Sequence, residues 1–76
     1  MKLDEDRIDD AVLALLYLGL HLEYRAWKGF DWDAMDRLHE KGLISNPKGK
    51  AKSVAFSEEG LKLARERCEA MFGAKD

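Results

Sequence analysis

The spacing of apolar residues predicts a long first helix over residues 4–27. Asp4 occupies the position of an N-cap, and the acidic residues after it suit the positive end of a helix dipole. Wrapped as a helix, this segment carries two apolar stripes, so it has to be covered on more than one side. The first stripe holds Ile8, Val12, Leu15, Leu16 and Leu22, and the second holds Leu13, Tyr17, Leu20 and Tyr24.

Gly19 leaves a second interpretation of this segment open. A glycine within a helix costs about 1 kcal/mol relative to alanine, and the chain alternatively breaks here into two helices. The apolar spacing runs through Gly19 without a change of phase, which favours one helix that ends near Trp27.

A shorter second helix is predicted over residues 32–41. Residues 28–30 form a turn before it, Asp31 is its N-cap, and Gly42 follows it as the usual glycine stop. The side chains expected to face the core are Trp32, Met35 and Leu38.

A β-hairpin and a last helix complete the pattern. Residues 43–44 are predicted as a short strand, residues 46–49 have the composition of a type I turn, and residues 52–56 form the return strand. Ser57 then caps a helix whose apolar stripe holds Leu61, Ala64, Cys68, Met71 and Phe72; Gly73 ends it and residues 74–76 form a frayed tail. The sequence therefore predicts one α+β domain over residues 1–76.

Composition adds limits on chemistry. The chain has 76 residues and a net charge of −2, with 37% charged residues, which is typical of an ordinary soluble surface. Cys68 is the single cysteine, so an internal disulfide is impossible, and its place on the apolar stripe predicts burial. His21 and His39 lie in no metal-ligand spacing. We expect no catalytic residues, no metal and no cofactor.

The sequence carries no targeting signal that we recognise. The longest apolar run, residues 11–20, is shorter than the roughly 18 residues that a membrane span needs. No membrane association is expected, and the cytoplasm is the predicted compartment.

The second stripe of the first helix is the predicted dimer interface. Two further helices and a hairpin cover one stripe well and a second stripe only with difficulty. A symmetric contact between two copies would bury Leu13, Tyr17, Leu20 and Tyr24. The alternative is that the C-terminal helix packs on this stripe.

Aromatic residues gather at the turn between the first two helices. Trp27, Phe30 and Trp32 either close the end of a small core, which we favour, or form an exposed anchor for an unidentified protein partner.

The hairpin loop is the most basic segment of the chain. Lys48, Lys50 and Lys52 lie between Ser45 and Ser53 without an acidic residue. Lysines at alternate positions commonly protect an exposed strand edge, and we favour that interpretation. The alternative is that they contact a phosphate backbone.

Two stretches resemble known families. Residues 38–44 (LHEKGLI), the lysine-bearing hairpin and residues 54–60 (VAFSEEG) resemble the second half of winged helix-turn-helix domains, most closely those of MarR-type bacterial regulators. The resemblance implies a winged-helix-like fold with a long helix, a second helix, a β-hairpin wing and a C-terminal helix. Residues 25–34 (RAWKGFDWDA) are similar to a family of short bacterial proteins of unknown function, which implies no activity.

Two functions are compatible with these observations. The first, which we favour, is a homodimeric protein-interaction module. The second is a DNA-binding transcriptional regulator in which Arg37 approaches the bases and the three hairpin lysines contact phosphates. The helix in the recognition position holds four acidic residues (Asp31, Asp33, Asp36, Glu40) against two basic ones (Arg37, Lys41), and only two helices precede the wing. Both features disfavour nucleic-acid binding.

Overall fold

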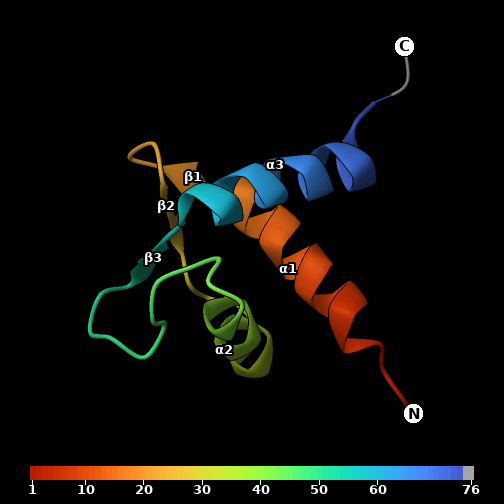
Figure 1. Cartoon of the computed structure of the whole chain (residues 1–76), viewed down its shortest axis with the longest axis horizontal. Helices are drawn as coiled ribbons and strands as arrows, with labels where there is room; N and C mark the ends of the chain where they lie inside the picture. Colours follow the sequence, from red (N-terminus) through yellow and green to blue (C-terminus); the bar gives the residue numbers. More distant parts are fainter. Residues whose placement is uncertain (75–76) are drawn as a thin grey trace.

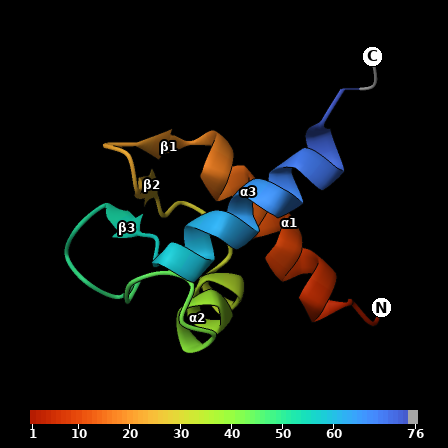
Figure 2. The same ribbon diagram turned by 45° about the horizontal axis from the view of Figure 1, so that its top comes forward.

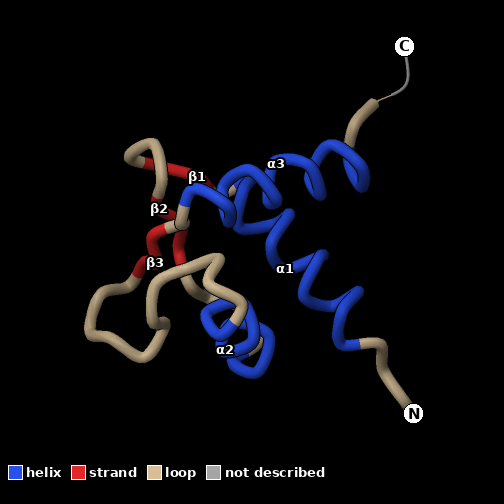
Figure 3. Tube along the Cα trace, in the orientation of Figure 1, coloured by secondary structure: helices blue, strands red, loops and turns tan. Residues whose placement is uncertain are grey.

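A computed structural model describes residues 1–74 as three helices and a small antiparallel sheet (Figure 1). In chain order the elements are α1 (Glu5–Leu18), β1 (Leu20–His21), β2 (Arg25–Trp27), α2 (Trp32–Glu40), β3 (Ser53–Ala55) and α3 (Glu58–Phe72). Figure 3 shows the strands at one end of the molecule, with the long loop between α2 and β3 beside them. The described chain is α+β, as the sequence predicts.

The first helix is shorter than predicted, because α1 ends at Leu18 and Gly19 is its C-cap. The Gly19 N–H donates to the carbonyl groups of Leu15 and Leu16, which closes the last turn. Leu22 and Glu23 then adopt φ values of 50° and 69°, a left-handed conformation that turns the chain back on itself. The prediction of one helix to Trp27 is therefore wrong, and the alternative of two helices is also wrong, since a β-hairpin follows the break.

The sheet has the order β1-β2-β3, with every neighbour antiparallel. Ala26 lies opposite both Leu20 and Val54, and these three side chains face α1. The predicted return strand is confirmed in β3, but its main partner is β2. The predicted strand at residues 43–44 is reduced to a single bridge between Ile44 and Phe56.

The core is centred on α1, which contacts α2, α3 and β2. Figure 2 shows α3 crossing in front of α1, with the strands to the left of the crossing and α2 below it. The buried cluster consists of Val12, Leu13, Leu16, Ala26, Ala34, Met35, Leu38, Leu43, Ile44, Val54, Phe56 and Ala64. A core of this size holds the three helices and the sheet as one unit.

The predicted helix starts are confirmed. The carboxylate of Asp4 accepts a hydrogen bond from the Arg7 N–H, and that of Asp31 accepts one from the Ala34 N–H. Gly42 has a φ of 76°, the left-handed conformation that favours glycine after a helix. Trp32 was expected to face the core, but as the first residue of α2 it is exposed.

Ser57 and Gly60 fix the start of α3. The Ser57 hydroxyl accepts from the Gly60 N–H at 2.9 Å and donates to the Gly42 carbonyl at 2.7 Å. A methyl group on Gly60 would lie 1.8 Å from the Leu43 carbonyl oxygen, so only glycine fits this approach. The Ser-Glu-Glu-Gly segment thus has two roles: Ser57 caps α3, and Gly60 allows its backbone to approach that of Leu43.

The apolar stripe of α3 is only partly inward-facing. Ala64 and Cys68 are buried as predicted, whereas Met71 and Phe72 are exposed. Those two residues lie in the last turn, where α1 and α3 diverge (Figure 1). The predicted frayed tail falls largely on residues 75–76, which lie outside the described residues.

The layout is compatible with a winged-helix-like architecture. A strand pair lies between α1 and α2, and the loop over residues 45–52 occupies the position of a wing before β3. Lys28 holds this loop, because its ammonium group donates to the carbonyls of Pro47 and Gly49 at 2.7 and 2.6 Å. Within residues 1–74, no helix is long and apolar enough to cross a membrane.

Candidate interaction surfaces

The predicted dimer stripe is only partly covered by its own chain. Leu13 is 1% exposed in the core. Tyr17 and Leu20 are half-buried and line a groove of about 370 Å³ with Leu61 of α3. Tyr24 is exposed but lies beyond the helix, next to the hairpin turn. The four residues do not form one helical stripe, because the helix ends at Leu18.

A different face of α1 is apolar and exposed. Ile8, Ala11, Leu15 and Leu18 follow one another at intervals of three, four and three residues, which places them on one side of a helix. Leu18 is 62% exposed and Leu15 is 39% exposed. We name these four residues the α1 outer face. Its spacing is that of the a and d positions of a heptad, the seam by which helices pair.

Met71 of α3 extends this apolar surface. It borders a hollow of about 480 Å³ together with Ile8 and Ala11, and the charged side chains Arg7 and Asp10 form its rim. The sequence placed Ile8 and Leu15 on the first apolar stripe together with Val12 and Leu16. Val12 and Leu16 are in the core and Ile8 packs partly against it, whereas Leu15 is exposed.

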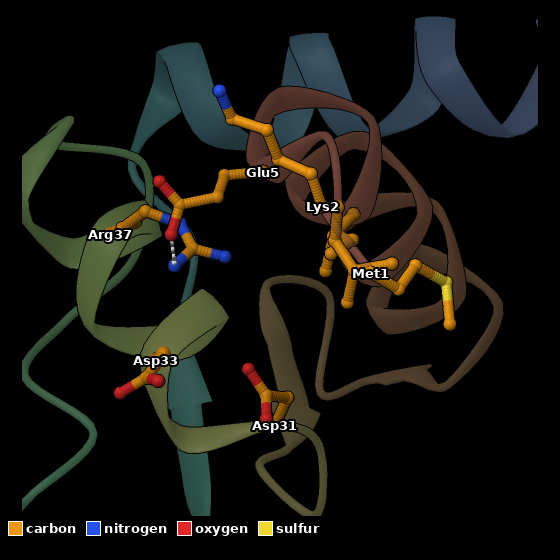
Figure 4. Close-up of a pocket in the computed structure, with 8 residues that line it drawn as sticks. Met1, Lys2, Glu5, Asp31, Asp33 and Arg37 are labelled. Atoms are coloured by element: carbon orange, nitrogen blue, oxygen red, sulfur yellow. Dashed lines mark hydrogen bonds and ion pairs between the residues drawn. The ribbon is translucent and has the colours of Figure 1, made fainter.

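An ion-pair cluster joins α1 to α2. Asp9 is 2% exposed and accepts from Arg37 in bidentate fashion, with N–O distances of 2.8–2.9 Å. Lys41 donates to the same carboxylate at 2.9 Å. Arg37 also reaches Glu5 at 2.9 Å, the dashed contact in Figure 4. We name Glu5, Asp9, Arg37 and Lys41 the α1–α2 ion cluster.

The pairing controls the charge of Asp9. Burial alone would raise the pKa of the Asp9 carboxyl group, but the hydrogen bonds from Arg37 and Lys41 outweigh it and lower the pKa below its ordinary value of 3.8. The hydrogen bond to Asp9 in turn raises the pKa of Arg37. Asp9 and Arg37 are therefore both charged at neutral pH.

Arg37 does not lie where the DNA-binding hypothesis requires it. Its guanidinium group contacts acids of α1 instead of projecting from α2. The exposed part of α2 carries Asp33, Asp36 and Glu40, and Lys48 of the loop lies 3.9 Å from Asp36. An acidic helix repels a phosphate backbone, so these contacts disfavour α2 as a reader of duplex DNA.

Figure 4 shows a hollow of about 500 Å³ beside the ion cluster. The carboxylates of Glu5, Asp31 and Asp33 line it, together with Arg37 and the first three residues of the chain. Across residues 1–74, no group of three or more histidine, cysteine or acidic side chains is placed to hold a metal ion. The lining thus combines these carboxylates with the cationic side chains of Lys2 and Arg37 and the apolar side chain of Ile8.

The predicted aromatic cluster is divided. Phe30 is half-buried against the core, as expected of a residue that closes it. Trp27 is 60% exposed at the end of β2, where its ring stacks on His21 with a centroid distance of 4.8 Å. Trp32 is exposed on α2. The two tryptophans therefore belong to different elements and do not close the core.

All three lysines of the loop are exposed, and Lys52 is next to the first residue of β3. Lys28 and Arg25 add positive charge on the neighbouring strand and turn, and Arg25 donates to the Ser53 hydroxyl at 2.9 Å. The basic loop is thus fastened to the sheet.

Comparison with known proteins places this small α+β chain among proteins without an assigned activity. A family model described as a domain of unknown function, DUF6429, matches residues 4–74, and the chain belongs to this family. The chain is 57% identical over 72 residues to the uncharacterized protein y4hR of Sinorhizobium fredii (strain NBRC 101917 / NGR234), which covers 95% of this chain and 97% of that protein. No solved structure matches.

Proposed function

We propose that this protein is a non-enzymatic binding module that works as a homodimer, with the α1 outer face as its contact. The observation that carries the proposal is the row of Ile8, Ala11, Leu15 and Leu18 along one side of α1, in which Leu15 and Leu18 are exposed and Ile8 and Ala11 are half-buried. Exposed apolar residues that form a continuous stripe are unusual on a soluble monomer.

A second copy of the chain is the occupant that this face fits. The residues follow heptad spacing, so two α1 helices related by a two-fold axis can interdigitate the same four side chains. Met71 of α3 borders Ile8 and Ala11 and widens the contact at the N-terminal end of α1. A chain of 76 residues buries a small core, and a dimer adds apolar burial without a disulfide or metal.

Lysine substitutions test this contact. The variants are Leu18→Lys and the double variant Leu15→Lys, Leu18→Lys. Both place positive charge near the C-terminus of α1, where the helix dipole favours it, so we expect the monomer to stay folded. We expect the dimer dissociation constant to rise at least about tenfold, because truncating or charging the centre of an interface costs more than about 1.4 kcal/mol. Light scattering after size-exclusion chromatography measures the change.

Leu22→Lys is the matched control. Leu22 is as exposed as Leu18 but lies in the hairpin turn, away from the α1 outer face. It should leave the dimer intact. Equal masses for Leu18→Lys, Leu22→Lys and the unsubstituted chain would contradict the proposal.

A further inference from the structure

The outer face of the sheet gathers polar and aromatic side chains on the side away from α1. His21, Arg25 and Trp27 alternate with the buried Ala26 and its neighbours, so they share one face. Opposite them on β3 lie Ser53, paired with Trp27, and Ala55, paired with Arg25. We name His21, Arg25, Trp27, Ser53 and Ala55 the outer sheet face.

An aromatic pair stands at the centre of this face. The rings of His21 and Trp27 lie 4.8 Å apart at an interplanar angle of 35°, and Trp27 remains 60% exposed. The imidazole of His21 lies against one side of the indole. The other side of an exposed indole is a platform on which a planar group can stack.

Arg25 shares this face with the pair, and lysines lie in the turn and the loop that adjoin the sheet. Arg25 is held across the strands by hydrogen bonds from its Nε to the Ser53 hydroxyl and from a terminal nitrogen to the Ser53 carbonyl, at 2.9 and 3.2 Å. Lys52 immediately precedes β3, and the Lys28 N–H donates to its carbonyl. The loop that carries Lys50 is tied to the sheet through the Lys28 ammonium group.

Charge is divided between the sheet and the helices. Residues 20–30 and 45–56 hold five lysines and arginines and one glutamate, a net charge of +4. The whole chain has 13 basic and 15 acidic residues, so the remainder holds eight and fourteen, a net charge of −6. The sheet and its loop are therefore a positive region on a negative protein, and they attract a polyanion in one orientation.

We propose that the outer sheet face binds single-stranded nucleic acid. A base stacks on the exposed side of Trp27, and Arg25, Lys50 and Lys52 contact the flanking phosphates. Stacking on an aromatic ring accepts any base, but it requires a base whose face is accessible, which a duplex does not offer. The interaction is separate from the dimer contact, because none of its residues belongs to α1.

Anisotropy of a fluorescein-labelled dT12 or U12 strand, titrated with the full-length chain at about 50 mM salt, tests the proposal. We expect saturable binding that is at least about tenfold tighter than binding to a 12-base-pair duplex. Trp27→Ala should weaken single-strand binding about tenfold. Phe72→Ala, which removes an equally accessible aromatic ring from α3, should leave it unchanged.

The salt dependence of binding tests the contacts of the lysines with phosphates. The double variant Lys50→Glu, Lys52→Glu should weaken binding and flatten its salt dependence, since each phosphate contact contributes about −0.7 to the logarithmic salt slope. Lys62→Glu on α3 is the control for a charge reversal on another element and should keep the slope.

Tryptophan fluorescence gives evidence that does not depend on the folding of Trp27→Ala. In a Trp32→Phe variant, Trp27 is the only tryptophan, and stacking of dT12 or U12 should quench it. No binding of the single strands at low salt, binding without quenching, or equal binding of single strand and duplex with Trp27→Ala unaffected would each overturn the proposal.

Discussion

Asp9 is the residue on which the contact between α1 and α2 depends. Its carboxylate is buried and carries the hydrogen bonds of both Arg37 and Lys41, which come from a helix 28 to 32 residues further along the chain. A buried carboxylate is tolerated only when it is paired in this way. The ion cluster therefore fixes where α2 lies against α1.

Asp9→Asn removes the negative charge and keeps the size of the side chain. We expect the free energy of unfolding to fall by roughly 2–3 kcal/mol. This loss is smaller than that expected on breaking a fully buried ion pair, because Arg37 and Lys41 keep some contact with water. Urea denaturation measures it. Glu5→Gln, which removes the exposed partner of Arg37, is the control and should change stability by less than about 1 kcal/mol.

The same carboxylate makes stability depend on pH. The folded pKa of Asp9 is lower than its unfolded value, so its contribution is complete above the unfolded pKa of about 3.9 and is lost as the pH falls toward the folded pKa. The difference in unfolding free energy between the unsubstituted chain and Asp9→Asn should therefore shrink between about pH 5 and pH 2. A difference that stays constant over this range would show that Asp9 acts through shape instead of charge.

Residues that act locally could be predicted from the sequence, and those that act across the fold could not. The caps Asp4, Asp31 and Ser57 bond three residues ahead, so their positions alone identify them. In the sequence alone, Arg37 cannot be distinguished from a surface arginine of a recognition helix, because its contact with Asp9 forms only in the folded chain. Its ion pairs depend on tertiary packing, which local spacing does not contain.

At the scale of elements, the end of α1 shows how periodicity misleads. Leu20 and Ala26 face the core from a β-hairpin, and their positions happen to continue the helical phase of residues 8–16. The evidence against a continuous helix is the left-handed conformation of Leu22 and Glu23, which neither residue type signals. Because the sequence did not predict this turn, it did not predict β1 and β2 either.

The close contact between Gly60 of α3 and the backbone of Leu43 leads to a further prediction. Gly60→Ala places a methyl group against the backbone of Leu43, so the start of α3 has to move. We expect a loss of roughly 3 kcal/mol or more in unfolding free energy, which lowers Tm by more than about 10 °C. Thermal unfolding followed by circular dichroism measures it.

Gly29→Ala is the matched control for this substitution. An added methyl group at Gly29 meets no atom within 4 Å, and its φ lies outside the left-handed region. Its effect should lie within about 0.5 kcal/mol. Similar losses for both variants would show that the approach of Gly60 to Leu43 is not what holds α3.

At the scale of the whole molecule, the two surfaces proposed as contacts differ in chemistry. The α1 outer face is apolar, and the outer sheet face is basic and aromatic. The sequence predicted that the first helix carries more apolar surface than its chain covers, but placed the excess on Tyr17 and Leu20. In the folded chain Leu13 is buried and Tyr17 and Leu20 are half-buried beside Leu61 of α3, whereas Leu15 and Leu18 are exposed.

Sedimentation equilibrium of the unsubstituted chain tests the dimer most directly. Across a concentration series that reaches about 50 µM, the account predicts that the mass rises from 8.7 kDa toward twice that value, because mass action populates the dimer. A mass of 8.7 kDa at every concentration would contradict it.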